Sequence, residues 1–284
     1  MGMLRIRTAL ARFRSLRSPI AGGASILDAY VTLPPSPQHA LDIFAGEWAS
    51  KLPPPLEHLT AGSARLFDDA RVKWAIERLG GVAGKRVVEL GPLEGGHTYM
   101  LDRAGAAEVL AIEGNRRAYL KCLVVKELLG LPAARFVCGD FTAYLREPDR
   151  RFDVAFASGV LYHMVTPVEL LASLARVSDA IFLWTHYYDE TLLGQTTRTA
   201  HRVTAGTEAS HDGFAHRLYR HDYGAALGSQ GFCGGSRPYS HWLTRDDILG
   251  ALRHFGLAHI EIAFEQPDHA NGPAFCVVAR RTAS

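Results

Sequence analysis

The ends of four short apolar runs carry residues that could bind a nucleoside. In chain order these ends are Glu89-Leu90-Gly91-Pro92-Leu93-Glu94-Gly95, Glu113, Gly139-Asp140-Phe141 and Ser158-Gly159-Val160-Leu161-Tyr162-His163. Glycines let a backbone pass close to a ligand, and the helix that follows offers unpaired N–H groups. Glu113 could accept hydrogen bonds from both hydroxyls of a ribose. Asp140 and Phe141 offer a carboxylate and a ring, which suit the edge and the face of adenine.

A glycine turn after a strand is not specific by itself, because ordinary strand-to-helix turns have the same composition. Polar and glycine residues follow all four apolar runs, and their order and spacing together favour a ligand site. A dinucleotide is disfavoured because the fingerprint G-x-G-x-x-G is absent: Leu93 stands two positions after Gly91, and Pro92 stiffens the turn. The phosphate-binding pattern G-x-x-x-x-G-K-[ST] is absent as well. The sequence therefore predicts a nucleoside without a pyrophosphate.

Alternating strands and helices would position these residues at one edge of a parallel sheet. Apolar runs predict strands at 86–90, 109–113, 135–138, 152–157, 180–185, 258–264 and 274–279. Helical spacing of apolar residues predicts helices at 63–79, 97–104, 117–129, 167–177 and 244–255. Thr244 is the expected N-cap of the last helix, with Asp246 and Asp247 in its first turn. The chain is therefore predicted to be an α/β protein.

Two stretches depart from this alternation. Residues 1–80 are predicted to form an N-terminal arm and helical cap, with five arginines and no acid in the first 27 residues and prolines throughout 28–60. Such a basic amphipathic arm could attract anionic lipid or nucleic acid, or pack on its own domain or on a partner subunit as a homodimer interface. Residues 189–241, within a main domain of 81–284, are rich in glycine, histidine and tyrosine and are expected to be a lid or acceptor-pocket insertion.

Composition sets broad limits. The 48% hydrophobic and 21% charged residues are typical of a soluble globular protein. No apolar stretch approaches the roughly 20 residues that span a bilayer. The cysteines at 122, 138, 233 and 276 contain no C-x-x-C pair, which disfavours a metal or redox cluster. Cys122 and Cys138 lie in apolar surroundings, so both are expected to be buried, reduced thiols in a cytoplasmic protein.

The set Glu89-x-Gly91, Glu113, Gly139-Asp140 and the run from Asp153 to His163 resembles class I S-adenosylmethionine-dependent methyltransferases. The resemblance implies a Rossmann-like doubly wound sheet of about seven mostly parallel strands with a final antiparallel strand, plus an N-terminal extension and an insertion after strand five. It places Glu89, Gly91 and Gly95 at the methionine end of the cofactor, Glu113 at the ribose, and Asp140 and Phe141 at the adenine. Pro92 and Ser158 are also predicted to bind the cofactor. Many members carry glycine where this chain has Leu93.

Methyl transfer from a sulfonium is an in-line displacement, so positioning does much of the work and a base is needed mainly for hydroxyl acceptors. His163 and His186 are the predicted catalytic bases because each stands at the carboxyl end of a predicted strand. The predicted acceptor-binding residues are Tyr162, Tyr188, Arg237 and His241. Any of these histidines could equally be structural. A divalent metal is not predicted, because no two carboxylates or histidines fall at a diagnostic spacing.

The resulting hypothesis is an enzyme that transfers a methyl group from S-adenosylmethionine to a small-molecule or carbohydrate acceptor, at oxygen. The run Gly159-Val160-Leu161-Tyr162-His163, followed by Pro167 and Leu170, also resembles the branch that builds the carboxymethoxy group on the wobble uridine of transfer RNA. A transfer RNA methylase or carboxymethylase is therefore one alternative. The other is a non-catalytic binding protein with a Rossmann-like fold, which the polar residues at successive strand ends disfavour.

Overall fold

The structure is a computed structural model that describes residues 26–195, 203–229 and 231–282. The chain divides into two units, Met1–Ala40 and Leu41–Ser284, which are described separately. The expected basic amphipathic arm within residues 1–27 lies almost wholly outside the described residues. Within the first unit, a short 3-10 helix η1 spans Ile26–Ala29. Helix α2, Pro37–Asp42, crosses the boundary between the units. The predicted division at residue 80 stays a prediction.

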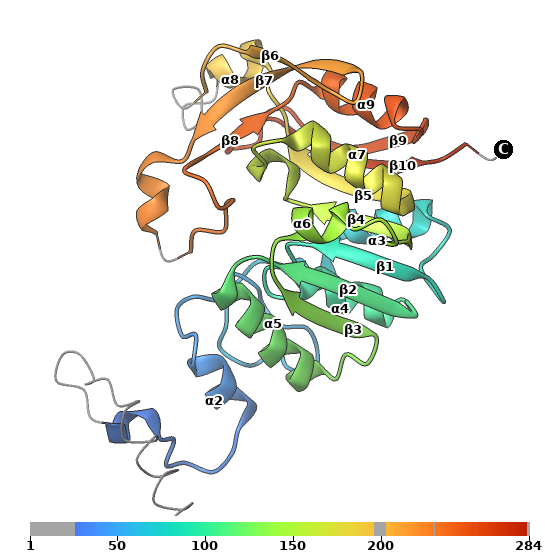
Figure 1. The fold of residues 1–284 in the computed structure, drawn as a ribbon. Coiled ribbons are helices and arrows are strands. Elements are labelled where there is room, and N and C mark those ends of the chain that lie inside the picture. Colours follow the sequence, from blue (N-terminus) through green and yellow to red (C-terminus); the bar gives the residue numbers. More distant parts are fainter. Residues whose placement is uncertain (1–25, 196–202, 230, 283–284) are drawn as a thin grey trace, which may run out of the picture. The chain divides into compact units, whose positions relative to one another are not determined.

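A seven-stranded sheet forms the centre of the second unit, in the order β3-β2-β1-β4-β5-β10-β9 (Figure 1). Its strands are β1 Arg86–Leu90, β2 Glu108–Glu113, β3 Ala134–Cys138, β4 Phe152–Ser158, β5 Ser178–His186, β9 His259–Gln266 and β10 Ala274–Arg280. Strands β1 to β5 pair in parallel, and β10 runs antiparallel to both β5 and β9. The predicted Rossmann-like sheet with an antiparallel final strand is confirmed.

Helices cover both faces of this sheet, because alternate strand residues point to opposite sides. Val88 packs in a core with apolar residues of three helices, α6 (Phe141–Arg146), α7 (Pro167–Val177) and α9 (Arg245–His254). Val87 points the other way and packs with α3 (Ala70–Arg78) and α4 (Gly96–Arg103). Helix α5 (Arg116–Leu129) packs beside β2 and β3 on that second side. Strands β1, β2, β4, β5 and β10 are therefore buried on both faces, which explains their continuous apolar runs.

Side-chain caps fix where four of these helices begin, because a cap satisfies backbone N–H groups that lack a partner within the helix. Thr244 caps α9 as predicted, accepting from the Asp247 N–H at 3.0 Å. Asn115 and Asp140 cap α5 and α6 in the same way. Asp69 caps α3, so the helix expected from residue 63 begins only at Ala70 and follows a 3-10 turn, η2, at Leu66–Asp68. The predicted start was therefore wrong by about two turns.

The insertion after β5 contains structure that the sequence pattern did not predict. Helix α8 (Glu190–Gln195) is followed by a three-stranded antiparallel sheet of β6 (Thr207–His211), β7 (Phe214–Asp222) and β8 (Tyr239–Trp242). A 3-10 helix, η5 (Gly224–Gly228), separates β7 from β8. Strands β6 and β7 are mostly exposed or half-buried and show no regular alternation. Without alternation the period-2 signal of a strand is weak, so these strands could not be recognised.

Residues 41–64 pack against α5 rather than forming a free linker. Leu41, Phe44, Trp48 and Leu52 are buried in one cluster with residues of α5 and β3. Phe44 and Trp48 of this proline-rich segment therefore cover an apolar surface. Residues 47–50 thereby come to lie beside the loop that follows β1.

One of the two thiol predictions is wrong. Cys122 is buried in α5 as expected, but Cys138 is exposed at the end of β3. The final residue of a parallel strand leaves the core and meets the open end of the sheet, so its apolar neighbours in sequence do not cover it. All four cysteines are free thiols. Among the described helices, none is long and apolar enough to cross a membrane.

Candidate cofactor and acceptor site

A cavity of about 1080 Å³ opens where β1, β2, β3 and β4 end. Nine of the residues predicted from sequence line it: Gly91, Pro92, Glu113, Asp140, Phe141, Ser158, Tyr162, His163 and Arg237. Ligand cavities for drug-sized molecules measure about 300–1000 Å³. This volume therefore accommodates a nucleoside together with part of a second molecule.

Glu113 ends β2 with its carboxylate in the cavity wall. Its Oε1 accepts from the Asn115 N–H at 2.7 Å, and its Oε2 accepts from the Leu93 N–H at 3.1 Å. Burial raises the pKa of Glu113, and these backbone N–H groups oppose the rise. Each carboxylate oxygen has two lone pairs, so both can still accept from a ligand hydroxyl. The carboxylate thus ties the loop after β1 to β2 and retains capacity for a ribose.

The end of β3 leaves open space beside a carboxylate and a ring. Asp140 caps α6 with one oxygen, Oδ1, which accepts from the Thr142 N–H at 2.8 Å and from the Thr142 hydroxyl at 2.6 Å. A Cβ atom at Gly139 would meet no atom within 4 Å. Gly139, Asp140 and Phe141 therefore form a concave part of the wall, and its open space, carboxylate acceptor and aromatic ring suit a nucleobase.

Two predicted cofactor residues lie behind the cavity wall rather than in it. Glu89 is 3% exposed, and its Oε2 accepts from the Thr98 hydroxyl at 2.5 Å. Burial raises the pKa of Glu89 to about 7, although His97 and Thr98 act to lower it. Gly95 has φ +76°, and a Cβ there would lie 3.1 Å from the Phe136 ring. Both residues shape the loop after β1 without lining the cavity.

The sequence did not reveal a polar cluster in another part of the cavity wall. Arg71 and His97 line the cavity, and both bind the buried carboxylate of Asp69. Burial works against ionisation of Asp69, but the hydrogen bonds from His97 and Arg71 hold its pKa well below the usual value. The Arg71 guanidinium carbon also lies 4.5 Å from the centre of the Trp184 ring, another residue of the wall. These residues come from α3, α4 and β5, and no local motif links them.

His163 lies in the wall beside Tyr162, on the 3-10 helix η3 (Leu161–His163). Its Nδ1 is 2.8 Å from the Tyr223 hydroxyl. Burial, with His186 and His221 nearby, lowers the pKa of His163 to about 3. Burial also raises the pKa of Tyr162. Both rings are therefore neutral near pH 7.

The other three predicted catalytic and acceptor residues do not line the cavity. His186 is 4% exposed, its Nδ1 is 2.8 Å from the Gly272 carbonyl oxygen, and its ring stacks on Trp242. Tyr188 stacks on Tyr219, with ring centres 3.5 Å apart. His241 lies with Nδ1 2.6 Å from the Val165 carbonyl oxygen. Each is held in packing or hydrogen bonding elsewhere in the fold.

The insertion supplies one side of the cavity through residues 232–237. A Cβ atom at Gly235 would lie 2.6 Å from the His163 carbonyl oxygen, so only glycine fits this close approach. At the other end of the loop, the Asn115 side-chain amide donates to the Phe232 carbonyl oxygen at 3.5 Å. The glycine run in the sequence was the available signal for this loop, and Arg237 was its one predicted member.

Residues 88–180 match the family described as a methyltransferase domain, and they span β1 to the beginning of β5. Residues 88–180 therefore belong to a methyltransferase domain. This match agrees with the methyltransferase that the sequence predicted, and that prediction implies S-adenosylmethionine as the cofactor. The four strand ends that line the cavity all fall within the matched residues.

Curated relatives resemble the methyltransferase domain over part of its length. A tRNA U34 carboxymethyltransferase of Methylococcus capsulatus is 34% identical over 120 residues, which are 38% of this chain and 35% of that protein. The protein of the same name from Psychrobacter arcticus is 30% identical over 111 residues, 36% of this chain and 32% of that protein. The chain therefore matches about a third of the length of these relatives.

Solved structures resemble the chain more completely in fold. The N-terminal domain of EvdMO1, solved with S-adenosylhomocysteine bound, superposes with a TM-score of 0.65 at 24% identity and covers 86% of this chain and 95% of that one. An S-adenosylmethionine-dependent methyltransferase from Mesorhizobium loti gives a TM-score of 0.53 at 19% identity, over 76% of this chain and all of that one. These similarities concern the fold.

The residues present fit the cofactor. Glu113 offers acceptor oxygens for ribose hydroxyls, and the concave part at Gly139 offers space for a base. Within the described part of the chain, no group of three or more histidine, cysteine or acidic side chains is placed to hold a metal ion.

Cys138 provides a direct probe of the cavity, since its exposed thiol lines the wall next to Gly139. A small alkylating reagent should label Cys138, and S-adenosylhomocysteine should slow that labelling several-fold by covering the thiol. Mass spectrometry of the labelled peptides checks this, with the buried Cys122 and Cys276 as unlabelled internal controls. Equal labelling rates with and without saturating ligand would contradict the assignment of the cavity.

Proposed function

We propose that this protein transfers the methyl group of S-adenosylmethionine to an oxygen of a small-molecule or carbohydrate acceptor. The bound cofactor supplies an electrophilic methyl group on a sulfonium. The continuity of the cavity supports an acceptor that binds inside it, next to the cofactor. It runs from the nucleoside-binding residues to a wall that contains Tyr162, His163 and Trp184. Such a wall presents apolar ring faces next to polar hydrogen-bonding groups, a combination suited to a hydroxylated ring.

His163 is the proposed base for the acceptor hydroxyl. We assign the imidazole proton of His163 to Nδ1, which then donates to the Tyr223 hydroxyl. The other ring nitrogen, Nε2, keeps its lone pair and can accept a proton. Because the pKa of His163 is about 3, the ring is neutral at physiological pH and is a weak base. It would therefore take the proton as the methyl group transfers rather than beforehand. Its protonation should not limit the rate between about pH 5 and 8.

A sugar is the first acceptor class to test. The EvdMO1 domain, which shares this fold, has been solved in the presence of S-adenosylhomocysteine and D-fucose. The transfer RNA alternative is not favoured, because the similarity to those enzymes covers only about a third of their length. We further propose a cytoplasmic location, consistent with four free cysteines, and homodimer formation remains a proposal.

The test measures S-adenosylhomocysteine formation with panels of sugars, hydroxylated small molecules and transfer RNA as separate acceptors. We expect turnover with a member of the first two panels, and at least a 100-fold lower rate for His163→Gln with unchanged cofactor affinity. His241→Gln is the matched control, because that histidine does not line the cavity. Turnover with transfer RNA alone, accompanied by salt-dependent RNA binding, would overturn the proposed acceptor class.

A further inference from the structure

A buried ion pair lies behind the cofactor loop, outside the cavity. The Lys121 Nζ is 2.8 Å from the Glu94 Oε1, and the side chains are 9% and 0% exposed. Glu94 belongs to the loop between β1 and α4, and Lys121 belongs to α5. Burying two charges carries a large desolvation cost, which is offset only when their remaining hydrogen-bonding capacity is also used. The arrangement of the other partners therefore shows what the pair holds in place.

Those partners are the backbone of residues 47–50. The Ala49 N–H donates to the Glu94 Oε1 at 2.9 Å, and the Ser50 N–H donates to Oε2 at 2.8 Å. The Lys121 ammonium also donates to the Glu47 carbonyl oxygen at 2.7 Å. The ion pair thus joins three segments that are distant in sequence: the cofactor loop, α5 and the segment that precedes the sheet.

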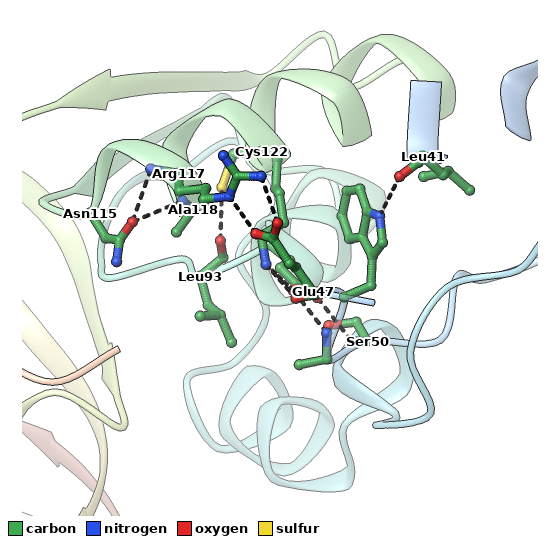
Figure 2. A network of polar contacts seen from close by, with 12 residues as sticks. Leu41, Glu47, Ser50, Leu93, Asn115, Arg117, Ala118 and Cys122 are labelled. Atoms are coloured by element: carbon green, nitrogen blue, oxygen red, sulfur yellow. Dashed lines mark hydrogen bonds and ion pairs between the residues drawn. The ribbon is translucent and has the colours of Figure 1, made fainter. Parts of the chain in front are cut away.

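Further contacts around the buried ion pair hold residues 47–50 in place (Figure 2). The Arg117 guanidinium pairs with the Glu47 carboxylate through two hydrogen bonds. The Trp48 indole N–H donates to the Leu41 carbonyl oxygen at 2.9 Å, and the Trp48 ring centre lies 5.5 Å from the Lys121 Nζ. The junction is therefore packed and hydrogen-bonded on both sides of the buried pair.

The residue before Glu94 carries backbone strain. Leu93 has φ +56°, a left-handed conformation that costs a non-glycine residue free energy. Its N–H donates to Glu113, and its carbonyl oxygen accepts from the Cys122 thiol at 3.6 Å. Leu93 lines the cavity, so its conformation shapes the cofactor site directly. A strained conformation of this kind persists only where its surroundings hold it.

We propose that Glu94 and Lys121 are positioning residues for cofactor binding: the buried pair docks residues 47–50 behind the loop and holds Leu93 in its left-handed conformation. This rests on the proposed function, since it assumes that the cavity binds the cofactor. Docking of residues 47–50 and occupation of the cavity are then coupled, and the coupling is reciprocal. Cofactor binding protects the docked segment, and loss of the pair weakens cofactor binding.

Glu94→Gln tests the coupling, because it keeps the side-chain shape and removes the charge. The dissociation constant for S-adenosylhomocysteine, measured by titration calorimetry, should rise about tenfold or more. In the wild type, the same ligand should slow hydrogen exchange of the Ala49 and Ser50 amides, and this ligand-dependent protection should disappear in the variant. Asp102→Asn is the matched control: Asp102 is also buried and accepts a backbone N–H, from Ala133 at 2.9 Å, but lies away from the cavity.

A second variant separates positioning from general loss of stability. Glycine adopts positive φ without a steric cost, so Leu93→Gly should reduce the effect of Glu94→Gln on the dissociation constant. A purely structural role would lower the melting temperature equally in both backgrounds and leave ligand affinity unchanged. If Glu94→Gln does not fold, the Glu94→Gln/Lys121→Met double variant removes both charges and is measured in the same way.

The outcomes are distinguishable. Two results would overturn the positioning role alone. One is a folded Glu94→Gln variant whose dissociation constant for S-adenosylhomocysteine is within twofold of the wild-type value. The other is a wild type in which the ligand does not change the hydrogen-exchange rates of the Ala49 and Ser50 amides. A folded wild type that does not bind S-adenosylhomocysteine at millimolar concentration would overturn the proposed function, and the ligand coupling with it.

Discussion

Glu113→Gln should raise the dissociation constant for S-adenosylhomocysteine on the order of 100-fold, because hydrogen bonds to a charged acceptor contribute roughly 1.5–3 kcal/mol each. The carboxylate can accept from both ribose hydroxyls while it binds the Leu93 and Asn115 N–H groups. An amide has one acceptor oxygen, and its NH₂ group would face an N–H donor. The substitution therefore removes ligand hydrogen bonds and also disturbs the loop after β1.

Titration calorimetry measures this effect, and circular dichroism checks that the variant remains folded. Glu108→Gln is the matched control, since Glu108 begins the same strand at the opposite end and lies away from the cavity. Its affinity for the ligand should equal that of the wild type. An unchanged dissociation constant in a folded Glu113→Gln protein would show that the ribose does not bind at the end of β2.

Glu89→Gln should stabilise the protein at pH 8, by on the order of 3 kcal/mol, and should have little effect near pH 4. The carboxyl of Glu89 is buried, and its pKa is raised from 4.5 to about 7. At pH 8 both the folded and the unfolded chain carry the ionised carboxylate, but only the folded chain must bury it. A neutral amide of the same shape avoids that cost and can still accept from the Thr98 hydroxyl.

The pH dependence follows from the direction of the shift. Below about pH 4.5 the carboxyl is protonated in both states and contributes nothing to the free energy of unfolding. Between about pH 4.5 and pH 7 the unfolded state loses its proton first, so the wild type loses stability as the pH rises. Above about pH 7 the loss is complete and constant. Urea unfolding of wild type and Glu89→Gln at about pH 4 and at about pH 8 measures the difference.

Glu169→Gln is a control of opposite sign. The hydrogen bond from Arg146 lowers the pKa of Glu169, so this carboxylate stabilises the folded state at neutral pH and the variant should gain nothing at pH 8. If Glu89→Gln is equally or less stable than the wild type at pH 8, then the Glu89 carboxylate is compensated by a partner in the folded protein.

The central sheet and its strand ends could be predicted because short-range patterns determine them. Strands covered on both faces leave continuous apolar runs, such as Val109 to Ile112, and the ligand-binding residues follow each run directly. The N-cap at Thr244 was predictable for the same reason, since a cap and its helix are adjacent in sequence.

The part of the cavity wall that contains Arg71, His97 and Trp184 could not be predicted, because these residues meet only through the fold. Asp69 and His97 are 28 positions apart, and the stack of Arg71 on Trp184 joins α3 to β5. Neither contact has a local signature. His186 illustrates the converse: its position at the end of β5 suggested chemistry, but its side chain turns to the Gly272 carbonyl oxygen and the Trp242 ring.

The walls of the cavity are divided along the chain in a way that bears on how acceptor specificity could evolve. The nucleoside half comes from one contiguous stretch, from Gly91 to Ser158, whereas the loop at 232–237 is encoded far downstream and Arg71 upstream. Insertions or exchanges in the downstream segment can therefore change one wall of the cavity and leave the nucleoside half unchanged. Chimeras that replace residues 203–238 with the corresponding loop of a structural relative would test whether acceptor preference is inherited as a separate module.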